Sequence, residues 1–566
     1  NANGLLPVKV KISDDYGFSS LKLYYRLAES PYTSPDEKYK EIDIKFLKNE
    51  LSTEVAYVWD LNKLGIMPED RFEFYLQIND NDIISGPKSS KTQFISVRLP
   101  SLREVQKEAD LTQEKVEKNL EKLMKEALEV KKDIDELNRE LLKNKNGKKE
   151  ADFKDKKKAE EIAKKQQDLR EKMSDIQEKL EETSKKLQEN NLISQETLEK
   201  YMELQKLMKQ VDSPELRMMQ EKMQKALQNM DQEQLKKAME NFKFNEEQFR
   251  QSIERAMNLL KRMQAEQKTD ALKKRAEELA KQQDELSEET KNADPNDNDK
   301  KNELAKRQEK LQNELKNLEQ ELSNLENLMK EIGEEQMPLD DLKDAQDALN
   351  KEETSSEMQS SKESMQMGEM NKSNKSQKKA SQNLKKFAQK MGEMKEKMKK
   401  QSIEETMKQM QKSISDMLEL SDQQENIKNK TSNMDYNSTS LPQMAQNQAQ
   451  NFEALANVAK GMMELSQKSF AVTPEMGQEM AQALNQMRNA VESMADRDTR
   501  GATQAQSQAM GAMNRTIGQM QQMMEELKQQ NEGSCNNPGG SGSGEGQGNP
   551  MNQGNNGMSF SQRMQQ

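Results

Sequence analysis

The sequence contains no histidine and a single cysteine, Cys535. These absences exclude a disulfide framework and any metal site built from Cys and His ligands. Hydrophobic residues make up only 32% of the 566 positions and aromatic residues only 4%. Ordinary globular domains contain about 45–50% apolar residues. Such a chain can bury narrow seams between helices, but not thick compact cores.

No run of 18 apolar residues is present, so the sequence predicts no membrane-spanning helix. The chain begins Asn1-Ala2-Asn3, without an initiator methionine or signal peptide, and we expect a fragment or processed form of a longer protein. Any anchor would then lie upstream. The net charge of −11 is small for this length and argues against a nucleic-acid partner, which would need a basic face.

Without histidine, general acid–base chemistry would depend on carboxylates, lysine or tyrosine. Asp and Glu number 100, so pairs at helical spacing arise by chance, and a catalytic pair needs a pocket that shifts one pKa. Coiled-coil faces are not expected to offer such a pocket. Glycine-rich phosphate loops and serine-nucleophile motifs are missing. We therefore predict a protein that is not an enzyme, with no catalytic residues, cofactors, metal ligands or small-molecule substrate.

Two acidic clusters are candidates for calcium binding. Asp294–Asp299 has carboxylates at alternate positions, but it lacks the glycine at position six and has Ala305 where a glutamate is required. Asn79–Asp82 lies in a predicted β loop, where calcium sites occur. Turn formation by Asn and Asp is the simpler interpretation of that loop, and whether it binds calcium stays open.

The few aromatic residues gather in residues 1–100, which hold Trp59, the only tryptophan, and most of the tyrosines. Turn-rich segments separate six short alternating runs: Pro7–Ile12, Leu21–Leu27, Ile42–Phe46, Val55–Trp59, Arg71–Ile78 and Thr92–Val97. This pattern predicts an antiparallel β-sandwich of immunoglobulin or fibronectin type over residues 1–100. Pro100 closes it and Leu102 starts a helix at once, which indicates a rigid mount for the helical part of the chain.

The most regular stretch is Val116–Leu187. Its first arm has apolar residues at alternating spacings of four and three: Val116, Leu120, Leu123, Ala127, Val130, Ile134, Leu137 and Leu141. A second arm repeats the pattern at Ala159, Ile162, Leu169, Met173, Ile176, Leu180 and Leu187, with polar Gln166 and Thr183 as register markers. Gly147 lies in a polar segment between the arms and suits a reversal. We predict an antiparallel coiled-coil hairpin over residues 101–195.

Residues 196–335 predict a second helical hairpin that begins near Leu198. Asp212–Glu215 has the features of a helix start, with Pro at the first turn. One arm has apolar residues at Leu235, Met239, Phe242, Phe249, Ile253, Ala256, Leu260 and Met263, slips in phase near Lys268–Ala271, and resumes at Leu272, Ala276, Leu279 and Leu286. Asn292–Asp299 breaks the helix. The returning arm runs from Leu304 to Ile332, with Gln308 in its register.

Methionine takes over the apolar positions of residues 336–530. The seams contain Leu384, Phe387, Met391, Met394 and Met398, then Ile403, Met407, Met410, Ile414 and Met417, and finally Met510, Met513, Ile517, Met520, Met524 and Leu527. We expect helix starts near Pro442 and at Thr473–Glu475, and loops or weak helix over Glu352–Lys375 and Asp422–Ser440. Residues 531–566 are rich in Gly, Asn, Gln and Ser and predict a disordered tail.

The 40 methionines have two interpretations. They fill loosely specified helix seams, or they line adaptable grooves that accept varied apolar partners. Their heptad spacing favours filling. Soft-metal binding would need clustered, accessible thioethers, which the spacing does not require.

Two short motifs suggest a family. Lys11–Phe18 is followed by Leu21–Leu27, and Asn79–Asp82 leads to Gly86-Pro87-Lys88. Together with the long helical tract and the Met/Gln/Gly-rich end, they resemble the bacterial family called domain of unknown function 4175. The resemblance implies a long envelope protein whose transmembrane helices lie upstream, with this chain on the periplasmic side of the inner membrane. The family has no established activity, so it implies no functional residues.

The sequence is compatible with three hypotheses of function. The first is a non-enzymatic scaffold or spacer of the bacterial cell envelope that acts through coiled-coil contacts with protein partners or by self-association. The second is a periplasmic holdase chaperone that binds apolar segments through Met-lined helices, tested by changing Met407, Met410 and Met417 to Gln. The third, a hydrolase using carboxylates, needs a defined pocket.

Overall fold

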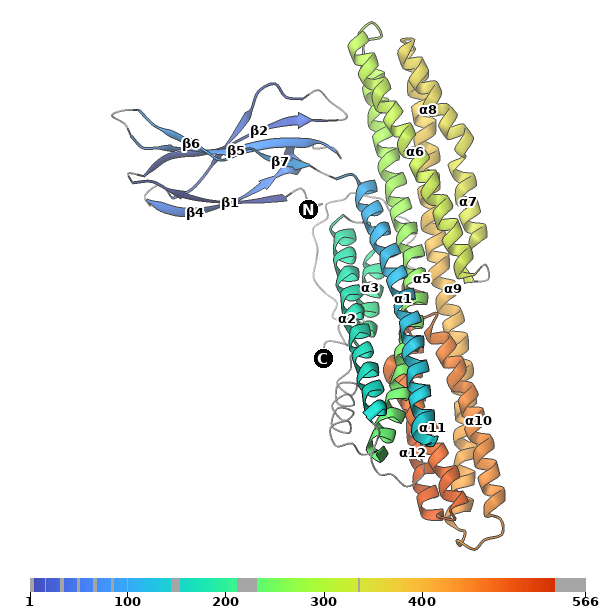
Figure 1. Ribbon diagram of the computed structural model, residues 1–566. Coiled ribbons are helices and arrows are strands. Elements are labelled where there is room, and N and C mark those ends of the chain that lie inside the picture. Colours follow the sequence, from blue (N-terminus) through green and yellow to red (C-terminus); the bar gives the residue numbers. More distant parts are fainter. Residues whose placement is uncertain are drawn as a thin grey trace, which may run out of the picture.

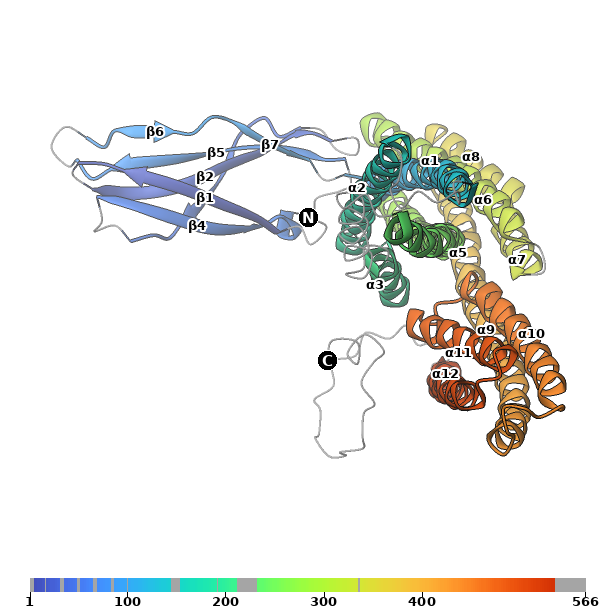
Figure 2. The same ribbon diagram turned by 60° about the horizontal axis from the view of Figure 1, so that its bottom comes forward.

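The computed structural model describes residues 5–15, 17–30, 35–47, 51–64, 69–82, 86–98, 100–143, 153–190, 192–210, 232–333 and 336–534. The chain is mainly helical, with an antiparallel β region at its N-terminal end. Figure 1 shows the β region projecting sideways from a long helical tract. Figure 2 shows α10, α11 and α12 grouped with one part of α9, apart from α2 and α3.

The strands are β1 Leu5–Ser13, β2 Phe18–Glu29, β3 Lys40–Ile44, β4 Ser52–Asp60, β5 Arg71–Asp80, β6 Ser89–Lys91 and β7 Ile95–Arg98, with a short 3-10 helix at Leu61–Leu64. The helices are α1 Leu102–Lys143, α2 Phe153–Glu189, α3 Gln195–Gln210, α5 Gln232–Asn292, α6 Asn298–Ile332, α7 Leu339–Leu349, α8 Lys351–Gln366, α9 Met370–Ser432, α10 Leu441–Ser466, α11 Pro474–Ala495 and α12 Thr499–Ser534.

The β region has two antiparallel sheets that share one apolar core. β1 pairs with β4, while the other sheet has the order β3-β2-β5-β6, with β7 also paired to β5. Because side chains alternate across a strand, Leu23, Trp59 and Phe74 all point into the shared core. Four of the six predicted runs lie within strands, Ile42–Phe46 extends two residues past β3, and Thr92–Val97 is a loop followed by β7. There the Thr92 hydroxyl accepts a hydrogen bond from Leu76 N at 3.0 Å.

The β region joins the helices through a capping box. Ser101 Oγ accepts from Glu104 N at 3.2 Å, and the Glu104 carboxylate accepts in return from Ser101 N at 3.1 Å. The same carboxylate pairs with Arg98 of β7 at 3.0 Å. The predicted start of a helix at Leu102 is confirmed, since the cap satisfies amide groups that the first turn leaves unpaired.

α1 and α2 lie side by side and run in opposite directions. Three ion pairs join them, Lys158–Glu136, Lys172–Glu126 and Lys186–Glu108, so that rising numbers on α2 meet falling numbers on α1. The predicted seam residues of both arms are at most 3% exposed; the Leu141 side chain lies outside the described part. Gln166 and Thr183 are buried among them.

α5 continues as one helix through the predicted phase slip at Lys268–Ala271. Phe249–Met263 pack against α1, α2 and α3, whereas Leu272–Leu286 belong to a second apolar cluster with α6, α7, α8 and α9. The phase of the apolar stripe therefore changes where the helix exchanges one set of partners for another. α9 does the same, since it passes from the second cluster into a third one with α10, α11 and α12.

These clusters run across residues 195 and 335, and the five predicted domain ranges stay predictions. The seams predicted for α6 and α9 are buried, including Gln308, except that Ile332 and Met407 are only half-buried. The starts of α10 and α11 are also confirmed, with Thr473 Oγ1 accepting from Met476 N at the cap of α11. The predicted break at Asn292–Asp299 separates α5 from α6.

Two expectations of loop or weak helix are wrong in part. Glu352–Lys375 is mostly α8 and the start of α9, and Asp422–Ser432 completes α9, whereas residues 433–440 form a loop as predicted. The Ser/Asn/Gln composition of these segments favours turns, but burial of Met358, Met365 and Ile427 holds them helical. Packing of an apolar face contributes more to helix stability than propensity does.

Several predicted features lie outside the described residues. They are the predicted reversal around Gly147, Asp212–Glu215, the side chains of Leu235, Met239 and Phe242, and all of the tail beyond Ser534. Within the tail region, α12 includes residues 531–534. In the part of the chain that is described, every helix is too polar or too short to cross a membrane.

Candidate functional site

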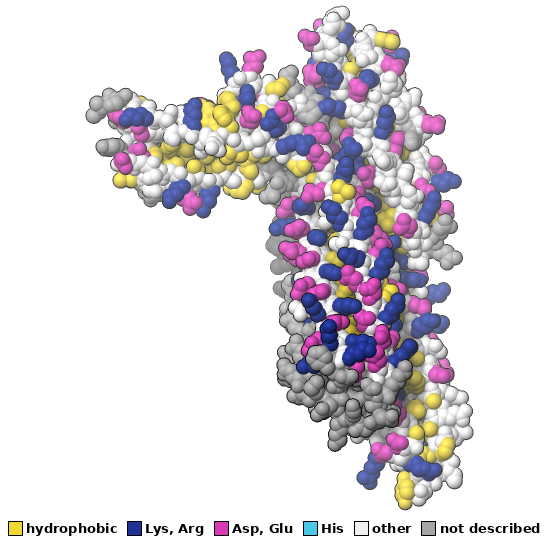
Figure 3. All heavy atoms as spheres, viewed as in Figure 1, with side chains coloured by type: hydrophobic (Ala, Val, Ile, Leu, Met, Phe, Trp, Pro, Cys, Tyr) yellow, Lys and Arg dark blue, Asp and Glu magenta, His cyan; other side chains and the backbone are white. Residues whose placement is uncertain are grey.

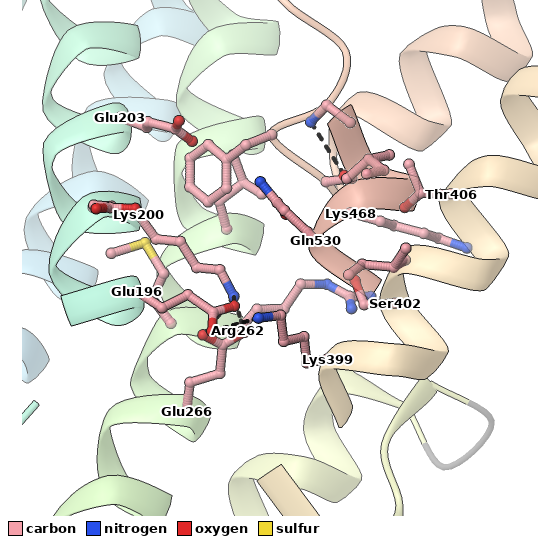
Figure 4. A pocket seen from close by; sticks show the side chains of 18 of the residues that line it. Glu196, Lys200, Glu203, Arg262, Glu266, Lys399, Ser402, Thr406, Lys468 and Gln530 are labelled. Atoms are coloured by element: carbon pink, nitrogen blue, oxygen red, sulfur yellow. Dashed lines mark hydrogen bonds and ion pairs between the residues drawn. The ribbon is translucent and has the colours of Figure 1, made fainter. Parts of the chain in front are cut away.

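A cavity of about 270 Å³ opens between α3, α5, α9, α12 and the connection from α10 to α11. We call it the inter-helix groove; Figure 4 shows its walls. Its lining combines five methionines with charged and polar side chains. The lining includes Glu196, Lys200, Met202, Glu203, Arg262, Met263, Glu266, Gln336, Met337, Met398, Lys399, Ser402, Phe470, Met523, Glu526, Leu527 and Gln530.

The groove exists because α3 has two different faces. Tyr201, Leu204 and Met208 are buried on one side and pack toward α1, α2 and α5. The opposite side is charged, with Glu196, Lys200 and Glu203 at helical spacings of four and three, and it lines the cavity. Burying this charged face under the apolar residues of α9 and α12 would cost free energy, because the charges would lose their hydration. These helices therefore leave a space there.

Paired charges form one wall of the groove. Lys200 Nζ donates to the Glu266 carboxylate at 2.7 Å, and Glu196 pairs with Lys399 at 3.1 Å (Figure 4). Deeper along the same three helices, Lys395 contacts Asp270 at 2.6 Å, with both side chains no more than 15% exposed. These pairs tie α3, α5 and α9 together.

Glu203 stands apart from that network. Among the described residues its carboxyl group has no ion pair or hydrogen bond, and Figure 4 shows it turned toward the cavity. Burial raises the pKa of Glu203 to about 7, against the opposing influence of Lys200 and Lys206. A half-buried carboxyl with this pKa can exchange a proton, or bind a cation, near neutral pH.

Arg262 of α5 lies across the groove from Glu203. Its guanidinium donates a hydrogen bond to the side-chain oxygen of Gln336, and Ser402 of α9 lies beside it (Figure 4). Burial lowers the pKa of Arg262. The groove thus presents a carboxyl group on α3 and a guanidinium on α5, and its lining also contains five methionines.

The expectation that helical faces offer no pocket able to shift a pKa is wrong for this chain, because the meeting of several helices leaves a cavity that a helix pair lacks. The arrangement nevertheless suits binding better than hydrolysis. Glu196 and Glu266 are each held in an ion pair, with Lys399 and Lys200, so neither is free to act on a substrate as the second carboxylate that such a reaction needs. Sequence reasoning missed Glu203 and Arg262; the stripe of charges on α3 was the available signal.

The two acidic loops play turn-forming roles. Asp80 Oδ1 accepts hydrogen bonds from Lys88 N at 2.8 Å and Asp82 N at 3.3 Å. Asp294 accepts from Asn296 N, and Asp297 caps α6 by accepting from Lys300 N at 3.0 Å. Within the described residues, no three Asp, Glu or Cys side chains are grouped so as to hold a metal ion.

Comparison with known proteins adds no assignment. No family model matches the chain, and no curated protein or solved structure matches it. The resemblance carried by Lys11–Phe18 and Asn79–Asp82 therefore stays an expectation.

Proposed function

We propose that this chain is a non-enzymatic scaffold or spacer of the bacterial cell envelope, the extracytoplasmic part of a membrane-anchored protein. One observation carries the proposal: α5 and α9, of 61 and 63 residues, each run unbroken from one apolar cluster into the next. A helix of 63 residues is about 95 Å long. Two such helices make a stiff body suited to holding partners apart.

We further infer that the β region is a sandwich of immunoglobulin or fibronectin type, and that α1–α2 and α5–α6 are coiled-coil hairpins. The first inference is supported by the two sheets facing each other around Trp59, and the second by buried apolar residues at heptad spacing. The envelope location and the upstream anchor come from the family resemblance alone.

The surface suits contacts with proteins. Figure 3 shows Lys and Arg interspersed with Asp and Glu along the helical body, and hydrophobic side chains along the β region. A surface of mixed charge does not attract nucleic acid strongly. Contacts with other proteins would then depend on local patches of the surface. Partner proteins, or a second copy, would bind through helical surfaces of this kind.

Small-angle X-ray scattering of the purified chain tests the spacer. A compact globule of this length has a radius of gyration of about 24 Å. We expect a value well above that, with a skewed distance distribution and a sedimentation coefficient lowered by friction. A radius near this globular value, with a symmetric distribution, contradicts the proposal.

A second candidate function, a holdase chaperone, is favoured by the methionines of the groove. Met410 and Met417 are fully buried, so changing them to Gln would test stability rather than binding. Met202 is 45% exposed and lines the groove. If the chain is a holdase, Met202→Gln should weaken suppression of client aggregation. Met367→Gln is the matched control, because Met367 is 74% exposed but lies outside the groove. Equal activity of both variants contradicts the holdase.

A further inference from the structure

The last turns of α12 line the groove through Met523, Glu526, Leu527 and Gln530. α12 ends at Ser534, one helical turn beyond Gln530. The remaining chain therefore starts beside the groove. Its 32 residues, 535–566, lie outside the described residues, but their sequence is known.

This terminal segment has two parts. Residues 535–557 are dominated by Gly, Asn, Ser and Gln, whereas residues 558–564 are Met-Ser-Phe-Ser-Gln-Arg-Met. Phe560 is the only aromatic residue after Phe470, and Arg563 is the only basic residue after Lys528. A short sequence with apolar residues and one cation thus follows a stretch with the composition of a linker.

We propose that residues 558–564 dock into the inter-helix groove of the same chain, with Phe560 and Met558 among the groove methionines and Arg563 paired with Glu203. Phe against thioethers gives favourable sulfur–aromatic contacts. The guanidinium supplies a direct ion-pair partner, which Glu203 does not have among the described residues even though Lys200 and Lys206 lie near it. Docking deepens the role of the groove and does not depend on the spacer proposal.

The linker length supports an intramolecular occupant. A Gly-rich chain of 23 residues has a root-mean-square end-to-end distance of roughly 25 Å, comparable with the distance across a few packed helices. Tethering at that length corresponds to an effective concentration on the order of millimolar, well above that of a second copy. The docked segment therefore competes with any external partner for the groove.

Photo-crosslinking in the full-length chain tests the docking. Benzoylphenylalanine replaces Phe560, and the crosslinked peptides are identified by mass spectrometry. We expect crosslinks within one molecule to groove residues of α3, α9 or α12, such as Met202, Met398 and Met523. The same photoreactive residue at Asn555, inside the glycine-rich stretch, should give at least about fivefold less groove crosslinking, since it lacks the docking contacts.

Charge reversal makes the test specific. Glu203→Lys and Arg563→Glu should each lower the crosslink yield at Phe560 about fivefold, and the double variant should restore it. Restoration cannot arise from misfolding of the singles. Crosslinks between two molecules would assign the groove to a second copy and overturn the proposal. Crosslinks scattered over the surface, or single variants without effect, would overturn it as well. Small-angle X-ray scattering tests the spacer proposal independently of these crosslinking results.

Discussion

Gln283 and Gln308 exchange two hydrogen bonds across the α5–α6 interface, at 2.9 and 3.0 Å. Gln308 Oε1 also accepts from Ser361 of α8 at 3.1 Å and from Gln377 of α9 at 3.2 Å. Four helices therefore share one buried polar layer. Such a layer is satisfied in one register only, so it selects the alignment of helices whose apolar seams would tolerate a shift.

Replacing Gln308 should destabilise this layer. Gln308→Leu removes both hydrogen bonds of the buried Gln283 amide and one acceptor each from Gln377 and Ser361, which keep their bonds to Thr290 and Ser373. We expect a loss of about 2–3 kcal/mol in the free energy of unfolding. Urea unfolding followed by circular dichroism measures it. Gln312→Leu, on the same helix but at the surface, should change the free energy by less than about 0.5 kcal/mol. Equal effects of the two substitutions contradict a register role.

The buried pair Lys395–Asp270 should contribute far more than its exposed counterpart. Asp270 also accepts hydrogen bonds from Ser194 N at 3.0 Å and Thr197 Oγ1 at 3.1 Å. Asp270→Asn leaves the Lys395 ammonium buried without a counter-charge, and we expect a loss of about 3–5 kcal/mol.

A second ion pair between the same two helices, α5 and α9, provides a matched control. Asp284 pairs with Lys385 at 2.6 Å, but these side chains are 41% and 59% exposed. Asp284→Asn should therefore cost no more than about 1 kcal/mol. Chemical denaturation of both variants compares them directly, and similar costs would show that burial of the Asp270 pair is unimportant.

Glu203 should make stability depend on pH in an Arg563→Gln variant, which lacks the guanidinium that docking would place beside this carboxyl group and that would lower its pKa. Its pKa of about 7 in the folded chain lies above the ordinary value of 4.5, so the folded state binds more protons between these values. The free energy of unfolding then falls as pH rises from about 4.5 to about 7, by on the order of 2 kcal/mol. Glu203→Gln should remove this decline, while Glu199→Gln, one turn earlier on α3, should keep it. Urea unfolding at about pH 5 and pH 8, on either side of the raised pKa, decides between the outcomes.

The β region should unfold as a unit of its own. Trp59, the only tryptophan, packs edge-on to Tyr25 and Phe74 with ring centroids 5.2 Å apart, in a cluster that includes no residue of the α-helices. Phe74→Leu should lower the urea midpoint seen by tryptophan fluorescence and leave the helical circular dichroism signal unchanged. Leu315→Ala in α6 should do the reverse, at a cost of about 2–5 kcal/mol. Coincident shifts in both signals would mean one cooperative unit and would refute the predicted boundary at residue 100.

The local pattern of apolar and polar residues was enough to predict most helices and strands. Alternation predicted the strands around Trp59 because each strand has one buried face, and heptad spacing predicted Val116 and Leu311 as buried because neighbouring helices meet along a stripe. The capping signal at Thr473-Pro474 located a helix start because it depends on adjacent residues only.

Amino-acid composition predicted secondary structure less reliably than residue spacing did. Glu352–Lys375 has few apolar residues, yet it is mostly helical because a few methionines meet partners distant in sequence. A phase slip at Lys268–Ala271 was visible in the sequence, but only the structure showed that α5 exchanges partners there without bending into a loop.

The sequence by itself determined that this chain is built from amphipathic helices and one aromatic-rich β region, since periodicity and caps depend on neighbouring residues. Only the tertiary structure decided which helices share a core, and it alone brought Glu203 and Arg262, 59 positions apart, to one cavity. That cavity results from the meeting of several helices. Helix seams resemble one another along the sequence, so their pairing depends on long-range packing and on polar layers such as that of Gln308.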